Sequence, residues 1–207
     1  PPEVQAVIDR LLTCELAQHG FTAVRDAQIL TPMNRGDLGT MTLNRHLQEL
    51  LNPRRHGIPE YRRGDTLLRP GDKVIQCANN YELSVFNGDI GFIQHADVEE
   101  GKLLIRFGDR TIAYDDESAI DLRLAYAITI HKSQGSEYPV AIIPMSTQHF
   151  VMLQRNLIYT AVTRAKKRAV LVGTARALQI AVGTQKSHAR QTRLSERIRC
   201  ASADISL

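Results

Sequence analysis

The middle of the sequence differs in pattern from both ends, and this difference limits the folds that the chain can adopt. Four short runs of apolar or alternating character follow one another there, with turn-forming pairs such as Asn87-Gly88 between or beside them. The runs cover residues 73–78, 89–95, 102–107 and 111–114. Short strands so closely spaced predict a small β-barrel inserted at residues 72–118.

Helix and strand patterns alternate on both sides of this insertion. Apolar residues recur at helical spacing in four stretches, and three shorter runs are continuously apolar. The predicted helices cover 4–16, 37–51, 151–166 and 175–182, and the predicted strands cover 27–33, 140–144 and 169–173. Residues 54–69 are polar and predicted as a loop, whereas 122–130 are apolar and alternating. The alternation predicts an α/β domain with a parallel sheet, which the insertion divides into residues 1–71 and 119–207.

The formal charge of +4 is distributed unevenly along the chain. The insertion has four basic against ten acidic residues, whereas 119–207 has 13 basic against four acidic residues. A polyanion is attracted to the last segment and repelled by the middle one. This division favours a nucleic acid as partner, with the basic residues after the insertion supplying the attraction.

Composition excludes several other classes of protein. Hydrophobic residues make up 43% and charged residues 23%, which is typical of a globular protein outside membranes. No apolar run approaches the roughly 18 residues of a membrane helix, and the first residues do not resemble a secretory signal. Cys14, Cys77 and Cys200 lie far apart without a CxxC pair. We therefore expect reduced thiols, no metal site, no membrane partner and a cytoplasmic location.

Two polar clusters lie where strands are predicted to end. Arg35 and Gly36 follow the first strand, and the carboxyl ends of parallel strands are where α/β folds place ligands. The second cluster, Thr-Ile-His-Lys-Ser-Gln-Gly-Ser-Glu at 129–137, is polar between two strongly apolar segments. Such residues are suited to contacts with a sugar–phosphate backbone. An ordinary loop after the first strand and a surface role for His131 are the structural alternatives.

The third cluster lies on the predicted helix 151–166. Arg164 falls at the edge of the apolar stripe of this helix, whereas Lys166 and Lys167 point to the other side. An arginine there pairs with a buried carboxylate or reaches a ligand in a cleft, unless the helix dipole or a snorkelling stem explains it. Gln154 lies within the stripe, and the pattern gives no reason for it.

Together and in this order, these clusters resemble the C-terminal motifs of superfamily-1 helicases, and most closely the RecD-like branch, the exodeoxyribonuclease V alpha subunit family. ILTPMNRG with LNRHLQELLNP resembles motif IV, ITIHKSQGSEY motif V and NLIYTAVTRAKK motif VI. GDKVIQCANNYELSVFNGDIGFI resembles the start of the inserted Src-homology-3-like barrel of that branch. The resemblance implies a RecA-like motor domain with this barrel inserted.

The resemblance also implies roles for individual residues. Motif VI would supply an arginine finger, Arg164, to the γ-phosphate of ATP, and motif IV a second cation, Arg35. Other residues would contact the single-stranded DNA backbone or link that contact to the nucleotide. The strand contacts implied are Thr129, His131, Lys132 and Ser133, and the linking residues are Gln134, Gly135 and Glu137. In the acidic barrel, we expect any strand contact to come from Asn80, Tyr81, Phe86 or Asn87, by stacking or neutral hydrogen bonds.

The sequence contains no GxxxxGK[ST] loop, and it has no acidic strand end that could pair with one. We therefore expect ATP and Mg²⁺ to be bound mainly by a preceding motor domain, and this chain alone to be inactive. The implied partners are single-stranded DNA, that domain and, in a nuclease complex, further subunits. Movement from 5′ to 3′ and a role in DNA repair or recombination follow from the resemblance. The alternatives are a segment of a conjugative relaxase-helicase and a stand-alone barrel module that binds a protein.

Overall fold

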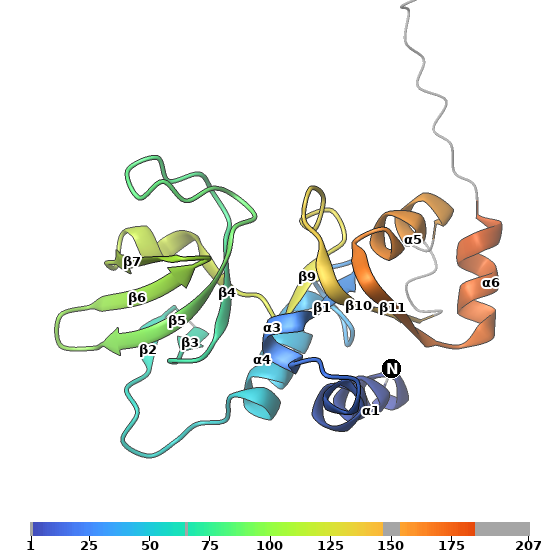
Figure 1. Cartoon of the computed structure of the whole chain (residues 1–207), viewed down its shortest axis with the longest axis horizontal. Helices are drawn as coiled ribbons and strands as arrows, with labels where there is room; N and C mark the ends of the chain where they lie inside the picture. Colours follow the sequence, from blue (N-terminus) through green and yellow to red (C-terminus); the bar gives the residue numbers. More distant parts are fainter. Residues whose placement is uncertain (1, 65, 147–153, 185–207) are drawn as a thin grey trace, which may run out of the picture.

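In a computed structural model of the chain, residues 2–64, 66–146 and 154–184 are described. Figure 1 shows the two larger sheets side by side. Helices lie on both sides of the four-stranded sheet. Residues 151–153 of the predicted third helix and the basic tail after 184 lie outside the described part. No helix in the described ranges is both long and apolar enough to cross a membrane.

The larger unit is built on a four-stranded parallel sheet in the order β11-β10-β1-β9. Its strands are β1 (Ala27–Thr31), β9 (Ala127–Thr129), β10 (Tyr138–Met145) and β11 (Ala165–Gly173). All of β1 and most of β10 are buried, which explains why their sequences are largely apolar, although Gln28 and Thr31 of β1 are buried polar residues. The predicted parallel α/β domain is confirmed.

Helices cover both faces of this sheet (Figure 1). The chain begins with α1 (Pro2–Arg10), a π-helical turn (Leu11–Glu15) and α2 (Leu16–Gln18), followed by α3 (Ala23–Asp26) and α4 (Thr40–Leu51). The later helices are α5 (Arg155–Val162) and α6 (Ala175–Gly183). Apolar residues at helical spacing, including Ile8, Leu43 and Leu47, are fully buried against the sheet. Three of the four predicted helices are thereby confirmed.

The prediction of one helix over 151–166 is wrong at its C-terminal end. Helix α5 ends at Val162, and β11 begins at Ala165, so Lys166 and Lys167 belong to a strand. Gln154 precedes the helix as its N-cap residue and does not lie in the apolar stripe. Pairing of β11 with β10 overrides the helix propensity of the Ala-Lys-Lys-Arg run.

The inserted unit is a five-stranded antiparallel sheet in the order β7-β6-β5-β4-β8. It consists of β4 (Lys73–Gln76), β5 (Ile90–Asp97), β6 (Lys102–Phe107), β7 (Arg110–Tyr114) and, after a 3-10 turn (Ser118–Asp121), β8 (Leu122–Leu124). The four predicted strands are confirmed, and β8 extends the sheet beyond residue 118. Among the described residues β7 and β8 do not pair with each other, so hydrogen bonding does not close this sheet into a barrel.

Two stretches differ from their predictions. Residues 54–69 contain a short hairpin of β2 (Tyr61–Arg63) and β3 (Thr66–Leu68) where a loop was predicted. The run 122–130 is divided between the two sheets, since the chain leaves β8 at Leu124 and joins the parallel sheet at Ala127. Leu122 and Leu124 of β8 and all of β9 are buried, whereas Arg123 between the two leucines is exposed.

A buried carboxylate lies where the chain passes between the two units. The oxygens of Asp72 accept hydrogen bonds from Gln48 Nε2 at 2.6 Å, Asn52 Nδ2 at 2.7 Å, and the Arg69 amide and the Tyr126 hydroxyl, both at 2.8 Å. Burial raises the pKa of Asp72, and these four donors oppose that shift. A network with so many specific partners favours one arrangement of the two units.

Lys73, the next residue, is also buried, and its Nζ donates to the Ala27 carbonyl at 3.0 Å. Burial lowers the pKa of Lys73 to about 7, far below its ordinary value of 10.5. Between pH 7 and 10.5 the unfolded chain holds a proton that the folded chain lacks. The free energy of unfolding therefore rises with pH across this interval.

Replacing Lys73 by methionine should raise the free energy of unfolding at pH 7 by about 1–3 kcal/mol, because the buried charge is removed while the packing volume is kept. The variant should also lose the rise of stability above pH 7. Urea unfolding at pH 6, 7, 8 and 9 measures both effects, and Lys102→Met, at an exposed lysine, is the matched control. A Lys73→Met variant that is less stable than the parent at every pH would refute this assignment.

Candidate nucleic-acid and nucleotide interface

The segment 130–137 connects β9 to β10 and folds back on itself. Thr129, at the end of β9, accepts a hydrogen bond from the Lys132 amide at 3.3 Å through its hydroxyl. Ser133 is fully buried, and its hydroxyl donates to the Ile130 carbonyl at 2.7 Å. Thr129 and Ser133 therefore shape the turn, whereas the His131 and Lys132 side chains are exposed and can reach a ligand.

This segment also crosses the parallel sheet from one end to the other. The register pairs Thr129 with Thr31, so the segment starts at the carboxyl end of the strands. It finishes at Tyr138, which begins β10 and pairs with Ala165, the first residue of β11. A displacement at one end of the sheet can thus be passed to the other through eight residues of backbone.

Arg164 lies at that second end, between α5 and β11. Its guanidinium donates to the Ser136 carbonyl at 3.2 Å, the Thr160 carbonyl at 3.3 Å and the Thr163 hydroxyl at 3.4 Å. Within the described residues it has no carboxylate within 4 Å, so a buried ion pair is not found there. Burial raises the pKa of the neighbouring Tyr138, and the charge of Arg164 opposes that shift. A half-exposed guanidinium with only neutral partners remains able to pair with an anion.

The predicted linking residues lie between His131 and Arg164. Gly135 has a φ of +86°, which favours glycine at this turn, and Gln134 is exposed. Glu137 forms an ion pair with Lys166 at 3.3 Å, with both side chains more than half exposed. Such an exposed pair adds little stability, but it joins the segment to the start of β11.

Arg35 is exposed in the loop that follows β1, and Gly36 there has a φ of +94°. Because β1 and β11 run parallel, Arg35 follows the end of one strand while Arg164 precedes the start of the other. The structure therefore does not bring these two arginines together. It instead puts Arg35 at the end of the sheet where Thr129 and the following turn begin.

The β4–β5 loop carries the remaining predicted contacts. Tyr81 and Phe86 are 76% and 47% exposed and lie edge to face, with ring centroids 6.1 Å apart. Asn80 shapes the loop, since its Oδ1 accepts a hydrogen bond from the Leu83 amide at 3.0 Å. The backbone amide of Asn87 donates a hydrogen bond to Asn79 Oδ1 at 2.9 Å. The side chain of Asn87 is exposed.

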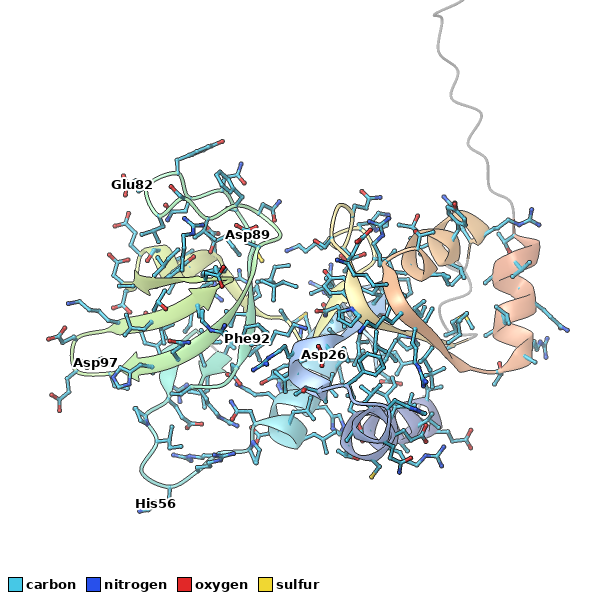
Figure 2. The ribbon with its side chains drawn as sticks, in the orientation of Figure 1. Asp26, His56, Glu82, Asp89, Phe92 and Asp97 are labelled. Carbon is cyan, nitrogen blue, oxygen red and sulfur yellow. The ribbon has the colours of Figure 1, made fainter. Side chains whose placement is uncertain are left out.

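The β4–β5 loop and segment 130–137 project on the same side of the molecule (Figure 1). The two loops differ in charge. The β4–β5 loop carries the acidic Glu82 and Asp89 (Figure 2), whereas segment 130–137 carries His131 and Lys132. One contact joins this segment to the inserted unit: Lys132 Nζ lies 3.1 Å from the Sγ atom of Cys77, the residue after β4. Sequence reasoning missed this contact, since no local pattern signals a pair 55 residues apart.

Two protein families match this chain in consecutive stretches. The family described as ATP-dependent RecD-like DNA helicase SH3 domain matches residues 43–107, and the family described as UvrD-like helicase C-terminal domain matches residues 124–172. The first stretch covers most of α4 and the inserted sheet through β6. The second covers the segment 130–137 and Arg164, the two features that the geometry joins.

Among curated proteins, the chain is 42% identical over 172 residues to the ATP-dependent RecD2 DNA helicase of Deinococcus radiodurans, covering 83% of this chain and 23% of that protein. It is 31% identical to the RecBCD enzyme subunit RecD of Mycolicibacterium smegmatis, covering 88% of this chain and 31% of that subunit. The chain thus spans less than a third of either relative. A solved Bacteroides Pif1 helicase has a TM-score of 0.57 at 18% identity, covering 98% of this chain and 54% of that one, which shows a shared fold.

Proposed function

Because this chain belongs to the RecD-like branch of the superfamily-1 helicases and corresponds to their C-terminal region, we propose that it is the second motor domain of an ATP-dependent DNA helicase. In this proposal ATP and Mg²⁺ lie between this domain and a first motor domain that holds the phosphates. The ion would be held with the nucleotide mainly by the other domain, because Mg²⁺ at such sites is bound through the phosphates and one or two carboxylates beside the phosphate-binding loop. Movement from 5′ to 3′, a role in repair or recombination and a cytoplasmic location belong to the same proposal.

One observation supports this function above the others: segment 130–137 joins the exposed His131 and Lys132 to Arg164 through the Ser136 carbonyl. The first two residues would contact the strand backbone, and Arg164 would stabilise the charge that develops on the γ-phosphate. Gln134, Gly135 and Glu137 would transmit domain closure from the nucleotide to the strand. Contacts confined to the backbone permit movement along any sequence.

Arg35 has a different role in this proposal from the one that the motif suggests. Its position beyond the carboxyl ends of the strands, beside Thr129, suits a phosphodiester of the bound strand better than the γ-phosphate at Arg164. Asn80, Tyr81 and Asn87 would contact the same strand from the inserted unit, where the exposed ring of Tyr81 can stack on a base. We propose that this unit, predicted at 72–118 between 1–71 and 119–207 and extended by β8 in the structure, acts as a Src-homology-3-like module. Further subunits of a helicase–nuclease complex are the partners suggested by the RecD name of the mycobacterial relative.

The strand contact can be tested on the chain itself. Replacing His131 and Lys132 together by alanine should weaken binding to single-stranded oligonucleotides by about ten-fold or more, equally for all base compositions. The reason is that both side chains are exposed and would contact the backbone only. Fluorescence anisotropy with thymine-rich, adenine-rich and mixed oligonucleotides measures this.

Lys102→Ala is the matched control, because Lys102 is an exposed lysine at the far end of the inserted sheet, paired with Glu100 at 2.8 Å. It should leave the affinity nearly unchanged. A change of base preference in the double variant would argue for base recognition at this turn. Equal effects of Lys102→Ala and the double variant would mean that attraction by net charge alone explains the binding.

A further inference from the structure

Two arginines converge on one carbonyl beside the contact between Lys132 and Cys77. Arg63, the last residue of β2, donates through Nη2 to the Ile120 carbonyl, and Arg123 of β8 donates to the same oxygen at 2.7 Å. Burial lowers the pKa of Arg63, and the nearby charge of Arg123 lowers it further. The two guanidinium groups are therefore close enough to repel each other.

Lys132 is connected to this pair through Cys77. Its Nζ contacts Cys77 Sγ, while the Cys77 amide donates to the Asp121 carbonyl at 2.8 Å, next to Ile120. The negative charge of Asp121 acts favourably on Arg63. In the described part of the chain, however, none of the three cations has a carboxylate within 4 Å, and the buried Nε of Arg63 lacks a hydrogen-bond partner.

Two guanidinium groups on one carbonyl, with Lys132 on the nearby Cys77, cost free energy through charge repulsion unless an anion binds beside them. The Ile120 carbonyl can accept from both arginines through its two lone pairs, but the buried Nε of Arg63 remains without a partner among the described residues. Planar guanidinium groups with free N–H donors match the oxygens of a phosphate, and a lysine adds a point charge.

We propose that Arg63, Arg123 and Lys132 form a phosphate-binding cluster that holds one phosphodiester of a single strand at the seam between the two sheets. The inference rests on the proposed function and extends it to Arg63, at the end of β2, and Arg123, on β8, which no motif singles out. Lys132 belongs to both sites, so a strand in contact with His131 would lie next to the cluster. A single strand is favoured over a free phosphate because Arg123 and Lys132 are exposed, and because Lys132 follows the exposed His131 in segment 130–137.

The experiment uses the whole chain, a fluorescein-labelled oligothymidylate and a series of potassium chloride concentrations. Arg63→Gln, Arg123→Gln and the double variant should each weaken binding, with the slope of log affinity against log salt shallower by about one per cation removed. Arg106→Gln is the matched control, because Arg106 is on β6 of the same sheet, over the Phe92 ring, and not at the seam. Thermal melting verifies folding, and the double Arg→Lys variant, which keeps both charges, should recover most of the salt slope.

An unchanged salt slope in the folded double variant, with binding still dependent on His131, would overturn the cluster and leave the proposed function intact. A second measurement compares the melting temperatures of the parent and the double variant with inorganic pyrophosphate at matched ionic strength. If pyrophosphate stabilises the parent but not the double variant, while strand binding is unaffected, the cluster binds a small phosphate and the proposal fails. A parent chain that does not bind single strands at all would instead reject the proposed function.

Discussion

Replacing Arg164 by alanine should lower the ATPase rate of the complete helicase by about three to five orders of magnitude, equivalent to about 4–7 kcal/mol of transition-state stabilisation. The effect is large because the charge on the γ-phosphate grows only as the bond breaks, so a fixed cation acts mainly on the transition state. Nucleotide affinity and melting temperature should change little. The structure supports this separation, because Arg164 donates only to neutral oxygens at 3.2–3.4 Å and no buried carboxylate would be left unpaired.

Two variants serve as controls for this result. Arg164→Lys should recover little activity, since an ammonium group does not reproduce the planar set of donors. Arg155→Ala removes an arginine at the start of α5 that also donates to a backbone carbonyl, that of Val182 at 2.8 Å, and it should keep most of the activity. A large fall in melting temperature for Arg164→Ala, with turnover retained in the folded fraction, would reject the arginine finger.

The elements that the sequence predicts well are those whose burial is regular. Buried β10 is a continuous apolar run, and β6 alternates between the two faces of its sheet. The limits of elements are less predictable where tertiary pairing decides. The run from Ala165 to Arg168 has helix-favouring residues, yet it lies in β11 because β10 offers it a parallel partner.

For the candidate site, the sequence predicts which residues take part but not what each of them does. Thr129 and Ser133 have the same chemistry as a strand-binding pair, and only the structure shows that they hold the turn. The opposite positions of Arg35 and Arg164 depend on strand direction and register, which motif order does not contain. Convergence of Arg63 and Arg123 on Ile120 likewise joins residues from β2 and β8, which no local pattern connects.

The second large effect concerns ATP turnover by the chain itself. The 207 residues include the arginine and the strand contacts of the proposed motor but no phosphate-binding loop, so the chain should not hydrolyse ATP even with single-stranded DNA present. Placed in one polypeptide with a first motor domain, the same residues should support turnover that DNA stimulates. The difference should exceed three orders of magnitude, because the reaction needs the phosphate loop and the arginine on facing domains.

Phosphate release therefore tests the central claim most directly. It should be measured for this chain and for the complete helicase that contains it, each with and without single-stranded DNA. We predict no turnover by the chain above the buffer rate, and DNA-stimulated turnover by the complete protein that disappears in Arg164→Ala. Robust turnover that copurifies with the chain alone, or full activity of the complete Arg164→Ala protein, would contradict the account.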